Sequence, residues 1–551
     1  MKADSCAPLR RFVLGMLLAV PAGAALAAVP LRVDLDATAA QPVSGRLLVF
    51  AIPAAEAEEQ AGDGKVEEVD ASPFRPTLVS VAAREVSRLA PGDAIAVDAD
   101  AVAFPAGFSS LPAGDYYLQA VLDANHDYNY GGRGAGDVVS KAVKARLPAQ
   151  QAIALTLSDV LPGREAWQFP PQMMDEATTK HLDQARRRAQ PLDFVSPALS
   201  AFRGQPVHMR GWVLLPPDYD TGKGTYPVVY FTHGFGGNLH YLAASAAAMY
   251  GRMAEGLVPP MIGVFLDESG PTGTHEFADS VNNGPWGEAL TTELIPWLEA
   301  RYRMDAKPSG RLLTGHSSGG WATLWLQVRY PKVFGGTWST APDPSDFHDF
   351  TGVDLYADGA NVYRRPDGTP YPLVRSKGEV IATFEQFAKL ERVLGEYGGQ
   401  MASFDWVFSP RGADGRPQPM FDRDTGAVDP QVAAYWREHY DISQRLRTQW
   451  PALRPDLDGK IRVIVGDADT FYLDGAARRL KDTLDALGAK AEVRFVPGRT
   501  HSDLYAEGDD RQALAKRIAW EMWAVARPGS TLKPPAPEAE AAVEAEAELV
   551  R

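Results

Sequence analysis

Apolar positions are distributed in two different ways along the chain, and the difference divides it into two regions. Up to about Leu161 they fall in short runs separated by Pro, Gly and Asp. These runs are Leu31–Leu35, Arg46–Ile52, Ala94–Val97, Tyr116–Asp123 and Ala152–Leu157. Short strands at turn-separated intervals are typical of β-sandwiches. We therefore predict a small, all-β, sandwich-like domain over residues 28–161.

After about Gly204 the apolar runs become unbroken and rich in Val, Ile and Leu. They cover Trp212–Leu215, Val228–Phe231, Met261–Leu266, Arg311–Thr314, Thr337–Trp338, Ile461–Val465 and Val493–Val496. Helical stretches lie between them, and over Leu290–Tyr302 the apolar residues recur on one stripe. Runs without alternation indicate strands that are buried on both faces of a mostly parallel sheet. We predict an α/β domain over residues 204–530, with helices on both faces of the sheet.

Three further segments interrupt or flank this plan. Residues 162–203 are expected to form a connector with a charged, solvated helix over Asp175–Gln190. Residues 342–440 are rich in Gly, Pro, Asp and aromatic residues, so we expect a cap-like insertion over the carboxyl edge of the sheet. Residues 531–551 form an acidic Ala/Glu/Pro stretch, which we expect to be disordered.

The first 27 residues have the pattern of a secretion signal. Basic residues precede an apolar run over Phe12–Leu26, and Ala25–Ala27 supplies the small side chains that signal peptidase accepts. A membrane anchor is the alternative, but the run is short for a bilayer and Pro21 interrupts it. We expect cleavage before Ala28, a periplasmic or secreted protein and no stable membrane insertion.

Charge and cysteine content exclude several classes of function. The 551 residues carry a formal net charge of −15, so nucleic acids and anionic membranes are poor partners. The one cysteine, Cys6, lies ahead of the predicted cleavage point. The mature chain is therefore expected to have no disulfide, thiolate zinc site or cysteine nucleophile. The sequence leaves the oligomeric state open.

One loop of the first region alternates oxygen-bearing side chains at Asp123, Asn125, Asp127 and Asn129. Calcium loops alternate in this way, but this loop lacks the turn glycine and the bidentate glutamate of an EF-hand. An Asx-rich turn is the favoured interpretation and a calcium site the alternative.

The strongest chemical motif is the G-x-S-x-G pattern around Ser317, within Gly315–Gly320. It follows the predicted strand Arg311–Thr314 and precedes a helix-like stretch over Trp321–Arg329. A serine on a sharp strand-to-helix turn is raised above the sheet, and glycines allow the backbone to pass close by. The motif alone is weak evidence, but this context is the one that its chemistry requires.

A serine nucleophile needs a base, and the base needs an orienting carboxylate. His501 follows the last predicted strand, and Asp467 and Asp469 follow the strand before it. We predict the triad Ser317, Asp469 and His501. We prefer Asp469 to Asp467 because the later carboxylate lies beyond the strand tip. Taken alone, each of these residues could instead have a structural role in a turn, at a helix cap or on the surface.

The glycine-rich stretch Thr232–Gly237 follows another predicted strand and is expected to form the oxyanion hole. We predict the backbone N–H groups of Phe235 and Ser318 as its donors. His233 and His316 are expected to support these turns structurally.

Residues 205–525 resemble the putative-esterase (esterase D-like) family of α/β-hydrolases, which includes feruloyl esterases. The resemblance is carried by Tyr226–Tyr230, His233–Gly237, Asn283–Gly287, Glu293–Pro296, Gly315–Gly320, Asp469 and His501. It implies that Ser317 is the nucleophile, His501 the general base and Asp469 its orienter. It also implies that no metal or organic cofactor is needed.

The chain departs from the family pattern in its first domain and in the insertion. Aromatic residues of the insertion, Trp406 among them, are candidate pocket residues, as is Trp286, although core packing is the favoured interpretation. The leading hypothesis is an exported serine carboxylic ester hydrolase that acts on small-molecule or saccharide-linked esters. A serine peptidase of the same fold and a non-catalytic envelope protein are the alternatives.

Overall fold

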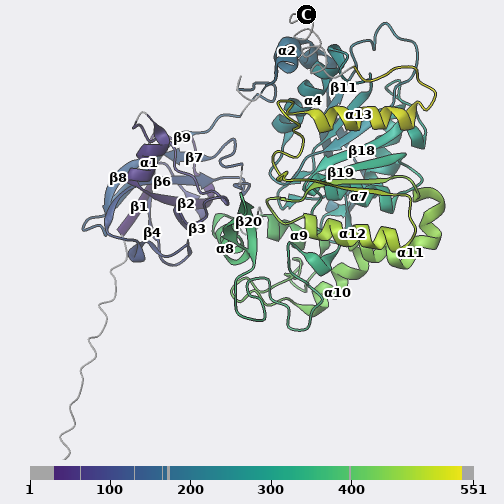
Figure 1. The fold of residues 1–551 in the computed structure, drawn as a ribbon. Coiled ribbons are helices and arrows are strands. Elements are labelled where there is room, and N and C mark those ends of the chain that lie inside the picture. The colour runs from purple at the N-terminus through teal and green to yellow at the C-terminus, as the bar shows by residue number, and fades with distance from the viewer. Residues whose placement is uncertain are drawn as a thin grey trace, which may run out of the picture.

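The computed structural model describes residues 30–535 except 63, 130, 164, 171–173 and 396–398. The predictions for the signal segment, for Cys6 and for most of the acidic tail fall outside these residues. The described part forms a β-rich domain and a larger α/β domain, which lie side by side (Figure 1). None of the helices in it is both long and apolar enough to cross a membrane.

The first domain is built on one nine-stranded sheet with the order β4-β1-β9-β7-β6-β2-β3-β5, and β8 pairs with β6. Its strands are β1 (Pro30–Leu35), β2 (Val43–Pro53), β3 (Ser80–Leu89), β4 (Ala94–Asp98), β5 (Ala103–Phe104), β6 (Gly114–Asp123), β7 (Val138–Ser140), β8 (Val143–Leu147) and β9 (Ile153–Val160). The five predicted strands are all present. The strands belong to one continuous sheet, and residues of β1, β4 and β9 share one apolar core with residues of β2 and β3. The two faces of β2 lie in separate apolar cores, with Leu47 in one and Leu48 in the other.

The α/β domain is built on an eight-stranded sheet with the order β10-β11-β13-β12-β18-β19-β22-β23. Its strands are β10 (Ala189–Val195), β11 (His208–Leu214), β12 (Val228–Thr232), β13 (Ile262–Leu266), β18 (Arg311–His316), β19 (Gly336–Thr340), β22 (Ile461–Gly466) and β23 (Glu492–Val496). β11 is antiparallel to both of its neighbours, and the six strands from β13 onward are parallel. Every predicted run of this region is one of these strands. The sheet begins earlier than expected, because β10 lies within residues 162–203.

Helices cover both faces of this sheet. Val228 and Tyr230 of β12 belong to one apolar core and Val229 to another, so both faces of the strand are buried. The helices around the sheet are α2 (Glu176–Arg188), α3 (Pro197–Arg203), α4 (Leu239–Ala254), α5 (Trp286–Ala289), a π-helical turn (Leu290–Leu294), α6 (Ile295–Glu299), α7 (Ser318–Arg329), α11 (Ile442–Leu457), α12 (Asp474–Ala486) and α13 (Ala513–Ala526). The arrangement is the predicted α/β-hydrolase fold, preceded by a β-rich region.

The insertion packs beside the sheet and brings together a large group of buried aromatic rings. It contains the hairpin β20 (Pro372–Ser376) and β21 (Glu379–Thr383) and the helices α8 (Phe384–Leu394), α9 (Gln400–Phe408) and α10 (Pro430–His439). The fully buried Trp436 lies 5.2 Å from Phe408 and 5.5 Å from Phe347, measured between ring centroids. These rings join the apolar core on one face of the main sheet.

The two domains meet through α8, which lies against β3 of the first domain (Figure 1). Leu390, Val393 and Leu394 of α8 share one apolar core with residues of the first domain. The buried guanidinium of Arg46 donates to the carbonyl oxygens of Val393 at 2.9 Å and Arg392 at 3.1 Å. The first domain is therefore held by a buried contact in addition to the connecting chain.

Candidate active site

Ser317 lies on the turn between β18 and α7, as the motif predicts. Its backbone has φ 60° and ψ −126°, a conformation that L-residues rarely adopt. A Cβ at Gly319 would lie 2.4 Å from the carbonyl oxygen of His233, so only glycine allows this close approach. The turn therefore has the geometry of a nucleophile elbow.

His501 and Asp469 are hydrogen-bonded to each other at the same edge of the sheet. His501 Nδ1 lies 2.8 Å from Asp469 Oδ2, with the carboxylate fully buried and the imidazole 11% exposed. The other carboxylate oxygen accepts the N–H of Phe471 at 2.9 Å. Burial opposes ionisation of Asp469, but the charge and hydrogen bond of His501 hold its pKa below the ordinary value. Asp469 is therefore an ionised carboxylate that orients the ring.

Asp467 has a different environment. It is exposed, and its Oδ1 accepts the N–H of Gly498 at 2.7 Å. The carboxylate that meets the histidine is that of Asp469.

The hydroxyl of Ser317 and the imidazole of His501 line one cavity of about 380 Å³. Because Nδ1 of His501 is engaged by Asp469, Nε2 is the ring nitrogen available to the serine. No hydrogen bond joins the two side chains in the described part of the chain. Such bonds are often long without substrate and shorten when substrate binds.

The glycine-rich loop that follows β12 lies directly against the elbow. A Cβ at Gly234 would lie 2.9 Å from the Cβ of Ser317, and Gly234, Phe235, Gly236 and Gly237 all line the cavity. Ser318 is the first residue of α7, where a backbone N–H has no acceptor within the helix. The structure thus brings both predicted oxyanion donors, Phe235 and Ser318, close to Ser317.

His233 and His316 have environments that suit structural roles. His233 is fully buried, with Nδ1 2.7 Å from the carbonyl oxygen of Gly234 and Nε2 3.0 Å from Asp267 Oδ1. Burial lowers the pKa of His316 to about 3, with the neighbouring His501 acting in the same direction. A ring that stays neutral in this way is a poor general base.

Asp343 is a buried carboxylate of this site that the sequence analysis missed. Its Oδ2 accepts a hydrogen bond of 2.6 Å from the Ser318 hydroxyl, and its own N–H donates to the Ser317 carbonyl at 3.3 Å. Burial raises its pKa to about 6, although the Ser318 hydrogen bond works against this shift. It follows β19, and its place shortly after a strand of the parallel sheet was the one available signal.

The insertion and the first domain complete the cavity. The insertion contributes mostly apolar side chains together with three polar ones, and its lining residues are Asp343, Pro344, Thr351, Leu373, Phe387, Gln400, Met401 and Phe404. The first domain contributes Pro73, Phe74 and Gly131. The pocket walls are therefore mostly apolar and come from three separate parts of the chain.

Trp286 and Trp406, the two tryptophans named as candidates for the pocket, do not line this cavity. The ring of Trp286 stacks on His275 with 3.5 Å between centroids, and its Nε1 donates to the carbonyl of Asn283 at 3.1 Å. Trp406 lies two residues after Phe404 on α9, and residues two apart on a helix do not share a face. Their absence from this lining agrees with core packing, the interpretation that the sequence favours for both.

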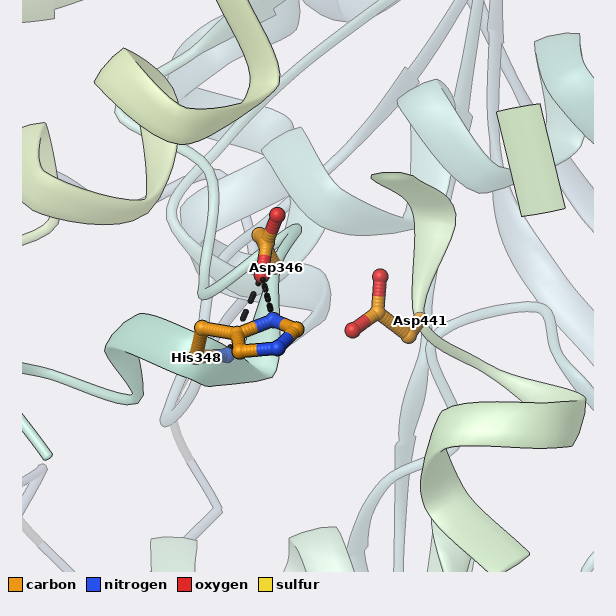
Figure 2. Close-up of side chains that lie close together, drawn as sticks. All are labelled: Asp346, His348 and Asp441. Carbon is orange, nitrogen blue, oxygen red and sulfur yellow. Dashed lines mark hydrogen bonds and ion pairs between the residues drawn. The ribbon is translucent and has the colours of Figure 1, made fainter. Parts of the chain in front are cut away.

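Among the residues that the structure describes, two clusters of Asp and His side chains could hold a metal ion by distance alone. In one, Asp346, His348 and Asp441 bring ligand atoms within 4.8 Å of one another (Figure 2). Their oxygens already accept protein hydrogen bonds, since Asp346 pairs with His348 and Arg447, and Asp441 accepts from Tyr356. This cluster is therefore explained by hydrogen bonding within the protein.

The second cluster is the Asp/Asn loop of the first domain. Asp123, Asp127 and Asp137 bring carboxylate oxygens within 4.8 Å of one another. Asp123 accepts the backbone N–H groups of Asn125, Asp127 and Tyr128, as in the Asx-rich turn that the sequence favours. Calcium at this loop stays a prediction.

Comparisons with known proteins agree with the resemblance seen in the sequence. The family model described as "Putative esterase" matches residues 206–502, which is more than half of the chain. Esterase Rv1288 of Mycobacterium tuberculosis is 31% identical over 172 residues, which cover 28% of this chain and 37% of that protein. Uncharacterized protein YbbA of Bacillus subtilis is 28% identical over 130 residues, which cover 22% of this chain and 51% of that protein. The chain thus spans little more than a third of the first relative and about half of the second.

Two solved structures are similar to part of this chain. An S-formylglutathione hydrolase from Agrobacterium tumefaciens is 14% identical with a TM-score of 0.34, over 61% of this chain and 94% of that one. A ferulic acid esterase from Anaeromyces mucronatus is 16% identical with a TM-score of 0.32, over 61% and 90%. On the match of the family model to residues 206–502, the chain belongs to the putative esterase family.

Proposed function

We propose that this protein is an exported serine carboxylic ester hydrolase that works through an acyl-enzyme, with Ser317, Asp469 and His501 as its triad. The observation that carries the proposal is the 2.8 Å contact between His501 and a buried, ionised Asp469, because His501 lines the same cavity as the strained Ser317. Family membership supports the ester as the bond that is cleaved.

In the acylation step, Ser317 Oγ attacks the carbonyl carbon of the ester while His501 Nε2 takes the hydroxyl proton. The carbonyl oxygen becomes an anion, which the N–H groups of Phe235 and Ser318 stabilise. The tetrahedral intermediate then collapses and the bond to the alcohol oxygen breaks. His501 returns its proton to that oxygen, and the acyl group stays on Ser317.

In the deacylation step, water takes the place of the alcohol. His501 removes a proton from the water as its oxygen attacks the acyl carbon, and it then gives the proton to Ser317 Oγ as the acid leaves. Asp469 keeps the ring in one tautomer and stabilises the imidazolium that forms twice in each cycle. Natural substrates are small-molecule or saccharide-linked esters.

A fluorophosphonate probe and a p-nitrophenyl ester test this proposal together. The wild-type chain should be labelled covalently and should hydrolyse the ester, and Ser317→Ala should lose both properties while keeping its melting temperature. Ser376→Ala, at an exposed position on β20, is the matched control and should behave like wild type. Labelling that survives in Ser317→Ala would contradict the proposal. Faster cleavage of aminoacyl p-nitroanilides than of esters would favour a peptidase.

Export is a separate element of the proposal and rests on the apolar run over Phe12–Leu26. Expression of the full chain in a bacterium should give a mature protein that begins near Ala28 in the periplasm or medium. Mass spectrometry of the N-terminus tests this, and an unprocessed chain in the cell pellet would contradict it.

A further inference from the structure

Building on the proposed function, we propose that Phe74 of the first domain forms the wall of the substrate pocket on the leaving-group side. The substrate class that follows is an ester whose alcohol carries a bulky apolar or aromatic group. The first domain is thus a specificity element of the enzyme.

The first domain reaches the cavity at two places. Pro73 and Phe74 lie in the segment between α1 (Ala54–Ala61) and β3, and Gly131 follows the Asp/Asn loop. A Cβ at Gly131 would lie 3.7 Å from the carbonyl oxygen of Gly236 in the oxyanion loop. The domain therefore borders the oxyanion loop through Gly131 and contributes Pro73 and Phe74 to the pocket lining.

The segment that carries Phe74 is held in place by buried contacts. The Arg133 guanidinium, 6% exposed, lies 3.0 Å from the carboxylate of Asp70 and also donates to the carbonyl of Val69 at 3.1 Å. The N–H of Val69 donates to the side chain of the buried Gln119 at 2.8 Å. Because Arg46 and α8 fix the domain itself, Phe74 is presented to the pocket by an anchored segment.

The position of the imidazole identifies which half of the ester meets this wall. His501 must deliver its proton to the leaving oxygen, so the alcohol lies beside its ring. The ring of Phe471 packs edge-on against the His501 ring, with 5.0 Å between centroids and 86° between planes. The ring centroids of Phe74 and Phe471 lie 6.0 Å apart, so the two phenyl rings form an apolar strip that extends from the imidazole of His501.

The apolar strip determines which kind of alcohol group can bind beside it. Phe74 is 47% exposed, although it lines a cavity that holds the nucleophile. An apolar or aromatic group that covers this ring gains hydrophobic and ring-stacking contacts. None of the described residues lining the cavity is Lys or Arg, so an anionic alcohol would find no counter-charge there. A bulky neutral alcohol is the best match.

The test compares the full-length chain with Phe74→Ala on three esters: ethyl butyrate, benzyl butyrate and ethyl 3-phenylpropanoate. Acid release is followed by titration, and each variant is compared with wild type on the same ester, so differences in intrinsic reactivity cancel. Phe74→Ala should lower kcat/KM about tenfold for the benzyl ester and less than twofold for the two ethyl esters. Phe74→Leu should recover part of the loss.

Two controls separate this proposal from failure of folding or of the proposed function. Phe202→Ala removes a ring that is 39% exposed and lies outside the cavity, and it should leave all three values unchanged. The rate of fluorophosphonate labelling should be the same in every variant. An equal loss on all esters, or a loss confined to the phenylpropanoate, overturns the role of Phe74. A wild-type chain that is neither labelled nor active on any ester overturns the proposed function instead.

Discussion

Replacing Asp469 by Asn should leave the fold intact and lower kcat about 10³- to 10⁴-fold. The side chains have the same shape, and the amide oxygen can still accept the N–H of Phe471, which now lies 2.9 Å from Oδ1. The amide nitrogen then takes the place of Oδ2 and presents a hydrogen to His501 Nδ1. The ring responds by accepting at Nδ1 and carrying its proton on Nε2, where it cannot receive the proton of Ser317.

Two contributions to the activation barrier determine how far kcat should fall. For Nε2 to accept the Ser317 proton, the His501 ring must return to its other tautomer, which breaks the hydrogen bond between the Asn amide and Nδ1 at a cost of about 1–2 kcal/mol. The transition state also loses the attraction between the imidazolium and the carboxylate, which is about 4 kcal/mol for charges about 4 Å apart at an effective dielectric constant of about 20. Together they raise the barrier by about 5 kcal/mol, and each tenfold loss of rate corresponds to about 1.4 kcal/mol.

Ester hydrolysis under saturating substrate measures this loss, and thermal unfolding monitors the fold. Asp467→Asn is the matched control, because this exposed carboxylate only accepts the N–H of Gly498. It should retain at least half of the wild-type kcat. The reasoning is refuted if Asp469→Asn keeps more than a tenth of the activity, or if both variants lose activity equally.

Two further predictions concern stability. Burial raises the pKa of Asp343 from 3.8 to about 6, so the folded protein binds this proton more tightly than the unfolded chain and loses stability as pH rises through that window. Asp343→Asn should therefore gain up to about 3 kcal/mol over wild type between pH 4 and pH 7 in urea unfolding, and an unchanged difference would contradict this. Arg46→Ala leaves the carbonyl of Val393 unpaired in the domain contact and should cost about 2–3 kcal/mol. Lys144→Ala, which breaks an exposed ion pair at 2.7 Å, should cost less than about 1 kcal/mol, and equal costs would argue against the buried contact.

The sheet of the α/β domain could be predicted because its central strands are buried on both faces. Each such strand appears in the sequence as an unbroken apolar run, whatever lies around it. β10 escaped prediction because it is the edge strand of the sheet and contains Pro191, and proline is tolerated at an edge where a ladder bond is not required. β3 escaped because Arg84 and Glu85 interrupt its apolar pattern on exposed positions.

The cavity lining could be predicted much less well than the contact between His501 and Asp469. Choosing among the aromatic residues of the insertion requires the rotational phase of α9, which turns Phe404 and not Trp406 into the cavity. The irregular sequence around this helix does not reveal where it begins. Phe74 reaches the pocket only because α8 docks on the first domain. This contact joins segments more than 300 residues apart, so the sequence around residue 74 does not predict it.

The proposed nucleophile and the proposed specificity wall therefore depend on the sequence in different ways. A serine at φ 60° costs about 1–3 kcal/mol, and the surrounding backbone must hold it there. Here the Ser317 N–H donates to the carbonyl of Thr340 at 3.1 Å, and the glycines leave room for the neighbouring chain to pass. Because the glycines that this close packing requires stand within a few residues of Ser317, they leave a motif that can be recognised. The pocket wall has no comparable local constraint, since many apolar residues could serve at position 74. A change there should therefore alter which esters are accepted while leaving the chemical step unchanged.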